Sequence, residues 1–209
     1  KGEAGYNYLY RLNCGGDDYT DSFGQLWLQD NTNYSHSWAE NFKDLNPYLA
    51  SQRTTNDPIR GTRDWKLFQH FRFGRHQLEY RFPVADGTYR IELYFTEPWH
   101  GTGGSASTDC EGLRIFDVAV NDSVVLDDLD IWAESGHDGV CKKVVYATVT
   151  GGMLRIHFPE VKAGQALISG IAIASTNEEL KPTAFPASDW SWEKADKEVM
   201  EKTPKELLP

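Results

Sequence analysis

The chain has 209 residues, of which 40% are hydrophobic, so it can bury the core of one globular domain and leave an additional segment outside it. Its formal net charge of −10 argues against a nucleic-acid partner, because phosphate binding needs a basic surface that 21 scattered Lys and Arg residues do not supply. No apolar run approaches the roughly 18 residues of a membrane span, and no signal peptide opens the chain.

Alternation of apolar and polar residues dominates the chain and predicts half-buried strands. The predicted strands cover residues 6–13, 67–73, 77–84, 88–95, 113–120, 123–131, 142–149, 153–159 and 166–174. Turn residues at Asp86-Gly87, Asn121-Asp122 and Gly151-Gly152 predict hairpins. Because no helical pattern lies between these strands, we expect an all-β fold, an antiparallel two-sheet β-sandwich of the jelly-roll, lectin-like kind.

Two segments depart from this pattern. Residues 29–65 are rich in Asn, Asp, Ser and Thr and include Trp38, and loops of this length are usually either functional or disordered. Residues 177–209 are predicted to be a linker followed by a short amphipathic helix that leads to a neighbouring domain, so the sandwich covers residues 1–176. Since Lys1 rather than Met opens the chain, we expect a piece of a longer protein, in which an export signal would precede it.

Catalytic and metal-binding motifs are absent, including G-x-S-x-G, the phosphate-binding P-loop and H-E-x-x-H. Glu97, Asp109, Glu111 and Asp117 include candidates for a glycosidase pair, but acidic pairs arise easily by chance in an acidic protein. The segments "GGDDYTDSFG" and "LDDLD" could bind Ca²⁺ through carboxylate and carbonyl oxygens, but they lack the spacing of a known calcium loop. Solvated turn carboxylates are the favoured interpretation, so no metal or cofactor is predicted, and a structural Ca²⁺ is left open. Three cysteines allow at most one disulfide, and a Cys110–Cys141 pair is left open.

Aromatic residues carry the more informative signal. The chain has seven Trp, ten Tyr and ten Phe, and Trp27, Trp38, Trp65 and Trp99 lie in or beside irregular segments. Apolar C–H faces of sugars stack on aromatic rings, and their hydroxyls pair with short polar side chains, so this pattern favours saccharide binding. The alternative is that each Trp covers an end of the sandwich. His137 is either a turn histidine bonded to backbone or a ligand contact.

Several segments together resemble a known family. They are "YRLNCGGDDYTDSFGQLWLQD", "FRFGRHQLEYRFPVADGTYRIELYFTEPW", "IFDVAVNDSVVLDDLDI" and "ALISGIAIA", and they are similar to malectin and malectin-like carbohydrate-binding domains. The resemblance implies a lectin-like sandwich whose loops hold an aromatic cradle for glucose-type oligosaccharides. The segments "TEPWHG" and "WAESGHDG" resemble the version embedded in large bacterial β-galactosidase-type glycoside hydrolases. This second resemblance implies an ancillary domain that is periplasmic or extracellular. Its partner would be a catalytic domain of the same polypeptide.

The family's binding residues can be carried over one position at a time. Trp27 and Trp38 match the family's first two aromatic positions, and Trp99-His100 matches its Tyr-Phe pair. An acidic residue before the last strand has no equivalent in "VKAGQALIS", which puts diglucose specificity in doubt. Trp65 and His137 are added because they lie in or beside loop segments. The candidate binding site therefore comprises Trp27, Trp38, Trp65, Trp99, His100 and His137.

Three functional hypotheses remain. The first is a non-catalytic carbohydrate-binding module. The second is a structural domain that no longer binds sugar and instead positions a glycosidase active site or an oligomer interface. The third is an autonomous glycosidase or lyase, for which no catalytic residue is predicted.

Overall fold

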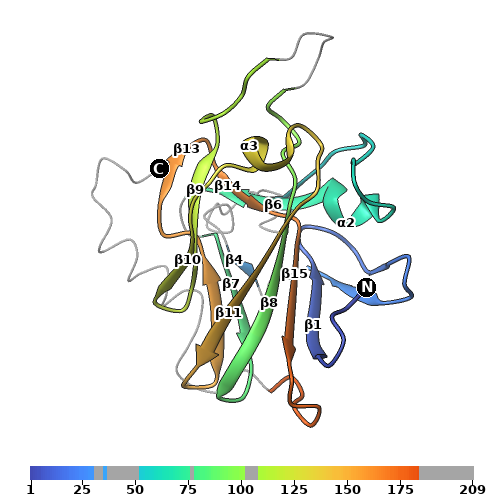
Figure 1. Ribbon diagram of the computed structural model, residues 1–209, viewed down its shortest axis with the longest axis vertical. Coiled ribbons are helices and arrows are strands. Elements are labelled where there is room, and N and C mark those ends of the chain that lie inside the picture. Colours follow the sequence, from blue (N-terminus) through green and yellow to red (C-terminus); the bar gives the residue numbers. More distant parts are fainter. Residues whose placement is uncertain (31–34, 37–51, 76–77, 102–107, 184–209) are drawn as a thin grey trace, which may run out of the picture.

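The structure is a computed structural model that describes residues 1–30, 35–36, 52–75, 78–101 and 108–183. It confirms the all-β sandwich: two sheets pack face to face, and a smaller third sheet lies at one end (Figure 1). The first sheet has the order β11 (Cys141–Val149), β8 (Gly87–Phe95), β15 (Gly170–Ser175), β1 (Asn7–Asn13), β3 (Leu26–Gln29), β2 (Tyr19–Thr20).

The second sheet has the order β10 (Ser123–Leu129), β9 (Ile115–Val120), β12 (Met153–His157), β7 (Glu79–Pro83), β4 (Ser35–His36), and β13 (Val161–Ala163) pairs with β9. The third sheet has the order β14 (Ala166–Ile168), β6 (His70–Gly74), β5 (Gln52–Thr54). Within the described ranges two short helices, α2 (Trp65–Gln69) and α3 (Ile131–Ser135), lie near the third sheet at the same end of the sandwich (Figure 1). The pairing is antiparallel throughout the described strands except between β1 and β3.

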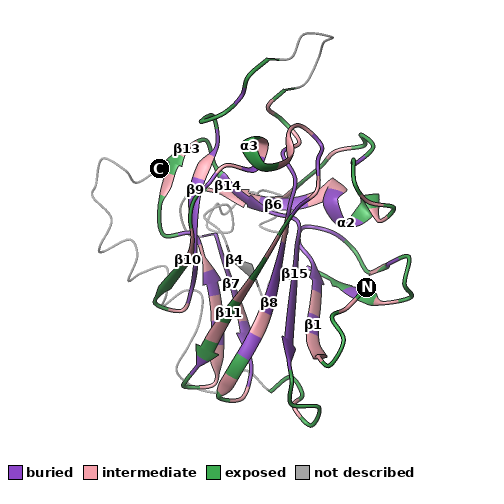
Figure 2. Ribbon diagram, viewed as in Figure 1, coloured by how far each residue is buried: buried purple, intermediate pink, exposed green. Residues whose placement is uncertain are grey.

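The core lies between the first two sheets, where the long strands contain runs of buried residues (Figure 2), and hydrophobic side chains fill it. Its fully buried side chains include Tyr80, Phe82, Tyr89, Ile91, Phe95, Phe116, Leu154, Ile156, Ile171 and Ile173. A side chain of this size contributes about 1.5–3 kcal/mol when it leaves water. The alternation of apolar and polar residues therefore places the apolar side chains of each strand on its inward face, and their burial holds the two sheets together.

A buried ion pair fixes the third sheet to the rest of the molecule. Arg72 of β6 lies 2.5 Å from Asp30, measured from Nε to Oδ2, and both side chains are fully buried. Asp30 Oδ2 also accepts the Tyr80 hydroxyl at 2.9 Å and the Gly15 amide at 2.8 Å. Buried charges need this degree of pairing. The network therefore joins β6 to the end of β3 and to β7.

Two of the three predicted hairpins are wrong. At Asn121-Asp122 the chain does form one, between β9 and β10, with Asn121 at a φ of 51°. At Asp86-Gly87 and Gly151-Gly152 the chain reverses but crosses to the other sheet, because β7 pairs with β12 while β8 pairs with β11. The two crossings bond each other: the Val84 amide donates to Gly152 O, and the Gly152 amide donates to Asp86 Oδ1.

Two predicted strands also need correction. The first part of the strand predicted at 67–73 is helical, because Leu67 and Phe68 are neighbours in sequence and both are buried, which a helical turn allows and a half-buried strand does not. The strand predicted at 166–174 is divided at Ser169 into β14 and β15, which belong to different sheets. The predicted C-terminal helix lies outside the described residues.

All three cysteines are free and buried, including Cys110 and Cys141. Burial raises the pKa of the Cys141 thiol to about 11. The thiolate is the reactive form, so this residue is poorly suited to redox chemistry or metal binding.

Candidate functional site

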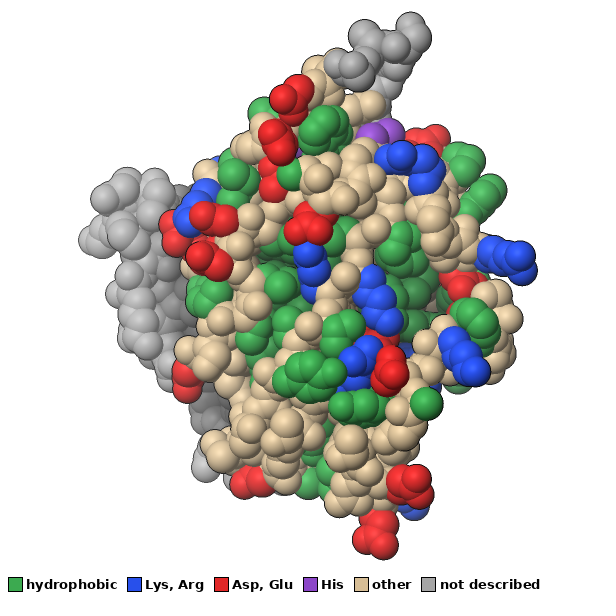
Figure 3. All heavy atoms as spheres, in the orientation of Figure 1, with side chains coloured by type: hydrophobic (Ala, Val, Ile, Leu, Met, Phe, Trp, Pro, Cys, Tyr) green, Lys and Arg blue, Asp and Glu red, His purple; other side chains and the backbone are tan. Residues whose placement is uncertain are grey.

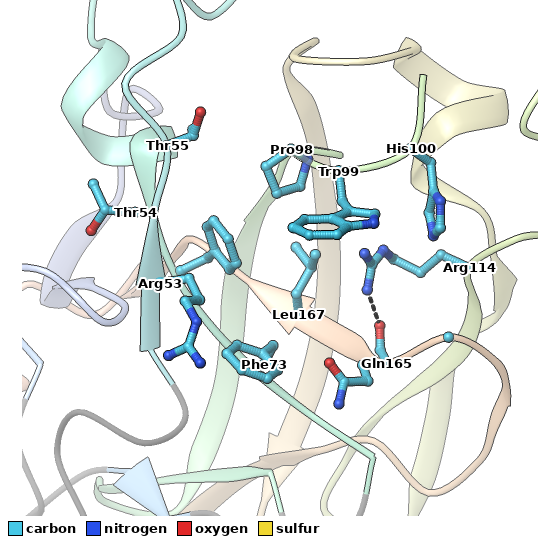
Figure 4. A pocket seen from close by; sticks show the side chains of 12 residues that line it. Arg53, Thr54, Thr55, Phe73, Pro98, Trp99, His100, Arg114, Gln165 and Leu167 are labelled. Carbon is cyan, nitrogen blue, oxygen red and sulfur yellow. Dashed lines mark hydrogen bonds between the residues drawn. The ribbon is translucent and has the colours of Figure 1, made fainter. Parts of the chain in front are cut away.

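A cleft of about 690 Å³ lies where the third sheet meets the segment that follows β8 (Figure 4). We call this segment, residues 96–101, the Trp99 loop. The cleft is lined by Arg53, Thr54, Thr55, Phe71, Phe73, Pro98, Trp99, His100, Arg114, Gly164, Gln165 and Leu167. These residues come from β5, β6, β14, the start of β9 and the Trp99 loop, so the site forms only when the third sheet is in place.

Aromatic and aliphatic side chains form the apolar part of the cleft. Trp99 is 73% exposed, the largest exposure among the large hydrophobic residues of the described chain. Its indole ring, Leu167 and Phe73 lie around one open space (Figure 4). An indole held in this way presents a flat apolar face to a ligand.

Glu97 holds the Trp99 loop in position from below. Its carboxylate is fully buried, and Oε1 accepts the backbone amides of Trp99 and His100, each at 3.0 Å. Arg114 pairs with the same carboxylate, with Nε 2.5 Å from Oε2 and Nη2 3.2 Å from Oε1. The remaining guanidinium nitrogen, Nη1, donates to the carbonyl oxygen of Gln165 at 2.5 Å. One buried ion pair therefore connects three walls of the cleft.

The loop then passes tightly over α3. Gly101 has a φ of +89°, and a Cβ atom built there would lie 2.8 Å from Trp132 Nε1 and 3.2 Å from His137 Cβ. Only glycine fits this position without strain. The helix itself begins at a side-chain cap, because Asp130 Oδ1 accepts the Ala133 amide at 3.0 Å. Trp132 and His137 thus form the support on which the end of the Trp99 loop lies.

Two arginines, Arg53 and Arg114, and one histidine, His100, line the cleft, and no Asp or Glu is among the lining residues in the described part of the chain. The guanidinium carbon of Arg53 lies 5.3 Å from the centre of the Phe73 ring, a cation–π distance, and its Nη1 donates to Gln52 O at 2.8 Å. The cleft therefore offers hydrogen-bond donors beside an aromatic surface.

Of the predicted site residues that the structure describes, two line this cleft, Trp99 and His100. Trp65 is 45% exposed at the start of α2, where its indole N–H donates to Thr62 O at 3.1 Å, and it does not line the cleft. His137 lies behind the Trp99 loop, with Nε2 2.9 Å from Asp138 Oδ2. Trp38 lies outside the described residues.

Trp27 requires a correction, because it is not in an exposed loop. It belongs to β3, is only 3% exposed, and packs with Ile59, Leu67, Phe68 and Ala172. Its indole N–H donates to Asp21 Oδ2 at 3.1 Å, and its ring meets Tyr94 edge-on at 5.2 Å. A ring enclosed to this degree has no face free for stacking.

A smaller hollow of about 200 Å³ lies beside Trp27 on the outer face of the first sheet. Basic and acidic side chains lie among hydrophobic ones on this face (Figure 3). At its centre Glu92 accepts the hydroxyls of Tyr8 and Tyr94, and Lys142 Nζ lies 2.8 Å from Glu92 Oε2. Since this carboxylate is already fully bonded, we interpret the network as structural.

Among the residues that the structure describes, two groups of side chains have ligand atoms within 4.8 Å of one another, as metal binding would require. They are Asp57, His137 and Asp138, and Asp117, Asp127 and Asp128. In the second group Asp128 pairs with Lys162, and Asp117 accepts the Asp128 amide. In the first, Arg60 Nη2 donates to His137 O at 2.7 Å, which places a positive charge beside the three ligands. Neither group has the coordination shell of a recognised metal site.

Sequence reasoning did not find Arg53, Phe71, Phe73, Arg114 or Gln165. Phe71 and Phe73 were part of a predicted strand, and Arg53 was in the irregular segment. Gln165 belongs to the segment in which the family's acidic residue is missing, and the structure puts its side chain in the cleft. The single available signal was the alternation of aromatic and basic residues in "FRFGR", which occurs in many strands.

No helix in the described ranges is both long and apolar enough to cross a membrane.

Comparison with known proteins adds a family and a fold. The model of the malectin domain matches residues 8–177. Malectin from Danio rerio is 25% identical over 150 residues, which are 71% of this chain and 47% of that protein. Malectin from Homo sapiens is 24% identical over 149 residues, 71% of this chain and 45% of that protein. The chain thus spans about half the length of the curated relatives it matches.

Among solved structures, a β-glucuronidase from Bacteroides uniformis superposes with a TM-score of 0.60 at 23% identity, covering 78% of this chain and 18% of that one. The plant receptor-like kinase ANX1 superposes with a TM-score of 0.62 at 16% identity, covering 86% of this chain and 50% of that one. At these identities the likeness concerns the fold.

Proposed function

The chain belongs to the malectin domain family, a family of non-catalytic carbohydrate-binding domains, and from this premise we propose that the cleft beside Trp99 binds an oligosaccharide. The observation that carries the proposal is the exposed Trp99 ring at the edge of a cleft of about 690 Å³. Ligand sites usually measure about 300–1,000 Å³ and combine apolar walls with a few polar groups.

The proposal gives each part of the cleft a role. Trp99 stacks on the apolar face of one sugar ring, and Phe73 and Leu167 extend that surface. Hydroxyl groups of the sugar bond with Thr54, Thr55, His100 and Gln165, all of which line the cleft and carry donors or acceptors. Glu97 and Arg114 act as positioning residues for the Trp99 loop and are not themselves required to contact the sugar.

We further propose that the domain is an ancillary part of a larger glycoside hydrolase, found in the periplasm or outside the cell. In this arrangement residues 1–176 bind sugar, residues 177–209 lead to the neighbouring domain, and the catalytic domain is the partner in the same polypeptide. Support comes from the motif resemblance and from the occurrence of a similar fold within 18% of the Bacteroides uniformis β-glucuronidase chain.

The test is a glycan array with the wild type, Trp99→Ala and Trp65→Ala. Trp99→Ala is expected to weaken binding on the order of thirtyfold, because truncation of a central aromatic anchor costs about 2 kcal/mol or more. Trp65→Ala removes a second exposed indole, one outside the cleft, and is expected to bind like the wild type. Circular dichroism and thermal unfolding establish that each variant is folded.

Two results would contradict the proposal. Loss of binding in Trp65→Ala with retention in Trp99→Ala would move the site to α2. A folded wild type that binds no glycan would instead favour the hypothesis of a structural domain, which is tested by deleting the domain from the parent protein and measuring activity.

A further inference from the structure

We propose that Asp57, His137 and Asp138 form a binding site for one divalent metal cation of the Zn²⁺ class. The site lies behind the Trp99 loop, and its three residues are not among those that line the cleft. The inference therefore goes beyond the proposed function and does not depend on it.

The three side chains come from separate parts of the chain and meet at one point. Asp57 precedes α2, whereas His137 and Asp138 follow α3, and each offers a ligand atom that lies within 4.8 Å of the other two. The ligand atoms of one Zn²⁺ ion lie about 3–4 Å apart, since each bond is about 2.0–2.2 Å long. Small side-chain rotations are therefore enough for the three residues to hold one ion.

Two buried atoms at this point lack a hydrogen-bond partner. Asp138 is only 6% exposed, and among the described residues nothing bonds to its Oδ1 or to Nδ1 of His137. The carboxylate that carries this oxygen is itself one of the three ligands, so the unpartnered atom belongs to the site. Native proteins rarely leave a buried carboxylate oxygen without a partner, and a bound cation is a group that supplies one.

The set of ligand atoms indicates which cation fits. Calcium takes about six to eight oxygen ligands, and this group offers one imidazole nitrogen and two carboxylate oxygens. That set suits Zn²⁺, which is commonly bound by three protein ligands with water in the fourth position. Asp57 is exposed, so an ion and its water can enter from that side.

The local charge also favours a cation. Asp57 and Asp138 bring two negative charges to the group, and Arg60 brings one positive charge beside it. The Arg60 guanidinium donates through Nη2 to the carbonyl oxygens of Ser135 and His137, at 3.0 and 2.7 Å. It is therefore held by backbone oxygens, and the sum of these three charges is −1.

A bound ion would fix the support on which the Trp99 loop lies. The Asp138 amide donates to Glu97 O at 2.9 Å, and Gly101 at the end of the loop lies against His137. Asp57 belongs to the segment that leads into α2. The ion would thus connect that segment to the one that follows α3, so its role is structural.

The test is isothermal titration calorimetry of the chain, freed of metal by a chelator, with ZnCl₂ and in parallel with CaCl₂. We expect one Zn²⁺ per chain, bound about tenfold or more tightly than Ca²⁺. Saturation with Zn²⁺ at about 100 times its Kd should raise the unfolding temperature by roughly 5–10 °C. Visible absorption of bound Co²⁺, used in place of Zn²⁺, reports the coordination directly.

Substitutions locate the ion. Asp57→Asn, His137→Gln and Asp138→Asn should each weaken Zn²⁺ binding by about 100-fold or more, because losing a group that merely orients a ligand already costs about 10–100-fold. Asp127→Asn is the matched control, since it removes a carboxylate from the other acidic group and should bind like the wild type. Asp57 is exposed, so Asp57→Asn is expected to fold even where the substitutions at the two less exposed ligands do not.

Each outcome supports the site or overturns it. Loss of Zn²⁺ binding in folded Asp57→Asn, with retention in Asp127→Asn, supports it. A folded wild type that binds no Zn²⁺ at millimolar concentration overturns it, as does equal binding by the wild type and Asp57→Asn. Tighter binding of Ca²⁺ than of Zn²⁺ overturns the class of cation. The glycan array measures a different property, so this proposal and the proposed function are tested separately.

Discussion

Glu97 is fully buried, yet its carboxylate is bonded to one arginine and two backbone amides of the Trp99 loop. The exposed Trp99 is thus held in place by a buried carboxylate. Because Glu97 and Arg114 both lose hydration on folding, each offsets the desolvation cost of the other.

Glu97→Gln preserves the size of the side chain but leaves Arg114 buried without a counter-charge. We expect a loss of about 3–5 kcal/mol in the free energy of unfolding, measured by urea denaturation, together with weaker saccharide binding. The control is Glu134→Gln, which breaks the surface pair with Lys143 and should cost no more than about 1 kcal/mol. Equal stability of the two variants would show that the buried pair does not organise the loop.

Trp27 and Trp99 show what a residue's local sequence can and cannot predict. Both lie near turn residues, and sequence reasoning expected both to be exposed. Trp99 is exposed, whereas Trp27 is covered by Ile59, Leu67 and Phe68, which are more than thirty positions further along the chain. The burial of Trp27 depends on α2 folding back over β3, and no pattern around residue 27 carries that information.

The Trp99 loop depends equally on its close contact with α3. Gly101→Ala should destabilise the domain by more than the roughly 1–2 kcal/mol that a positive φ alone costs, because the new methyl group would meet Trp132 and His137. Gly112→Ala is the matched control, with a φ of +81° and nothing within 4 Å of the added carbon.

Thermal unfolding and saccharide titration are the measurements for this pair of variants. A larger fall in unfolding temperature for Gly101→Ala, with reduced affinity only in that variant, is the expected pattern. If the two variants behave alike, the contact with α3 has no influence on the cleft.

At the scale of elements, alternation predicted the long strands of the sandwich but not the short strands β2, β3, β5 and β13, and the all-β sandwich is confirmed. Turn chemistry was not sufficient to predict their partners. The sequences Asp-Gly and Gly-Gly reverse the chain equally well within one sheet or between two, and the partner strand is decided by side chains far away. The cleft could not be predicted for the same reason. Three of its strands, β5, β6 and β14, are distant in sequence and come together by pairing in the third sheet.

Within the first sheet, the Glu92 network joins β1, β8 and β11 through Tyr8, Tyr94 and Lys142. Burial alone would raise the pKa of the Glu92 carboxyl, but hydrogen bonds from Lys142, Tyr94 and Tyr8 outweigh it and lower the pKa to about 2. In the unfolded chain this carboxyl titrates near its ordinary value of 4.5. Ionised Glu92 therefore stabilises the folded state fully above about pH 4.5.

The sign of this shift predicts acid sensitivity. The stabilisation from Glu92 should be complete above about pH 4.5 and disappear as the pH falls toward about 2. Thermal unfolding between pH 7 and pH 2 should show the wild type losing stability more steeply than Glu92→Gln. Glu111→Gln, which changes an exposed carboxylate, should follow the wild type. Parallel curves for the wild type and Glu92→Gln would contradict the prediction.

The position of β15 has a consequence for the order in which the protein is made. It is the last of the described strands in sequence, yet it lies in the middle of the first sheet, between β8 and β1. A ribosome releases residues 7–13 long before residues 170–175, so β1 has to wait for its antiparallel partner through most of the synthesis. A chain interrupted before residue 170 would carry two open strand edges where the sheet should be continuous, the kind of surface on which newly made β-proteins associate with one another.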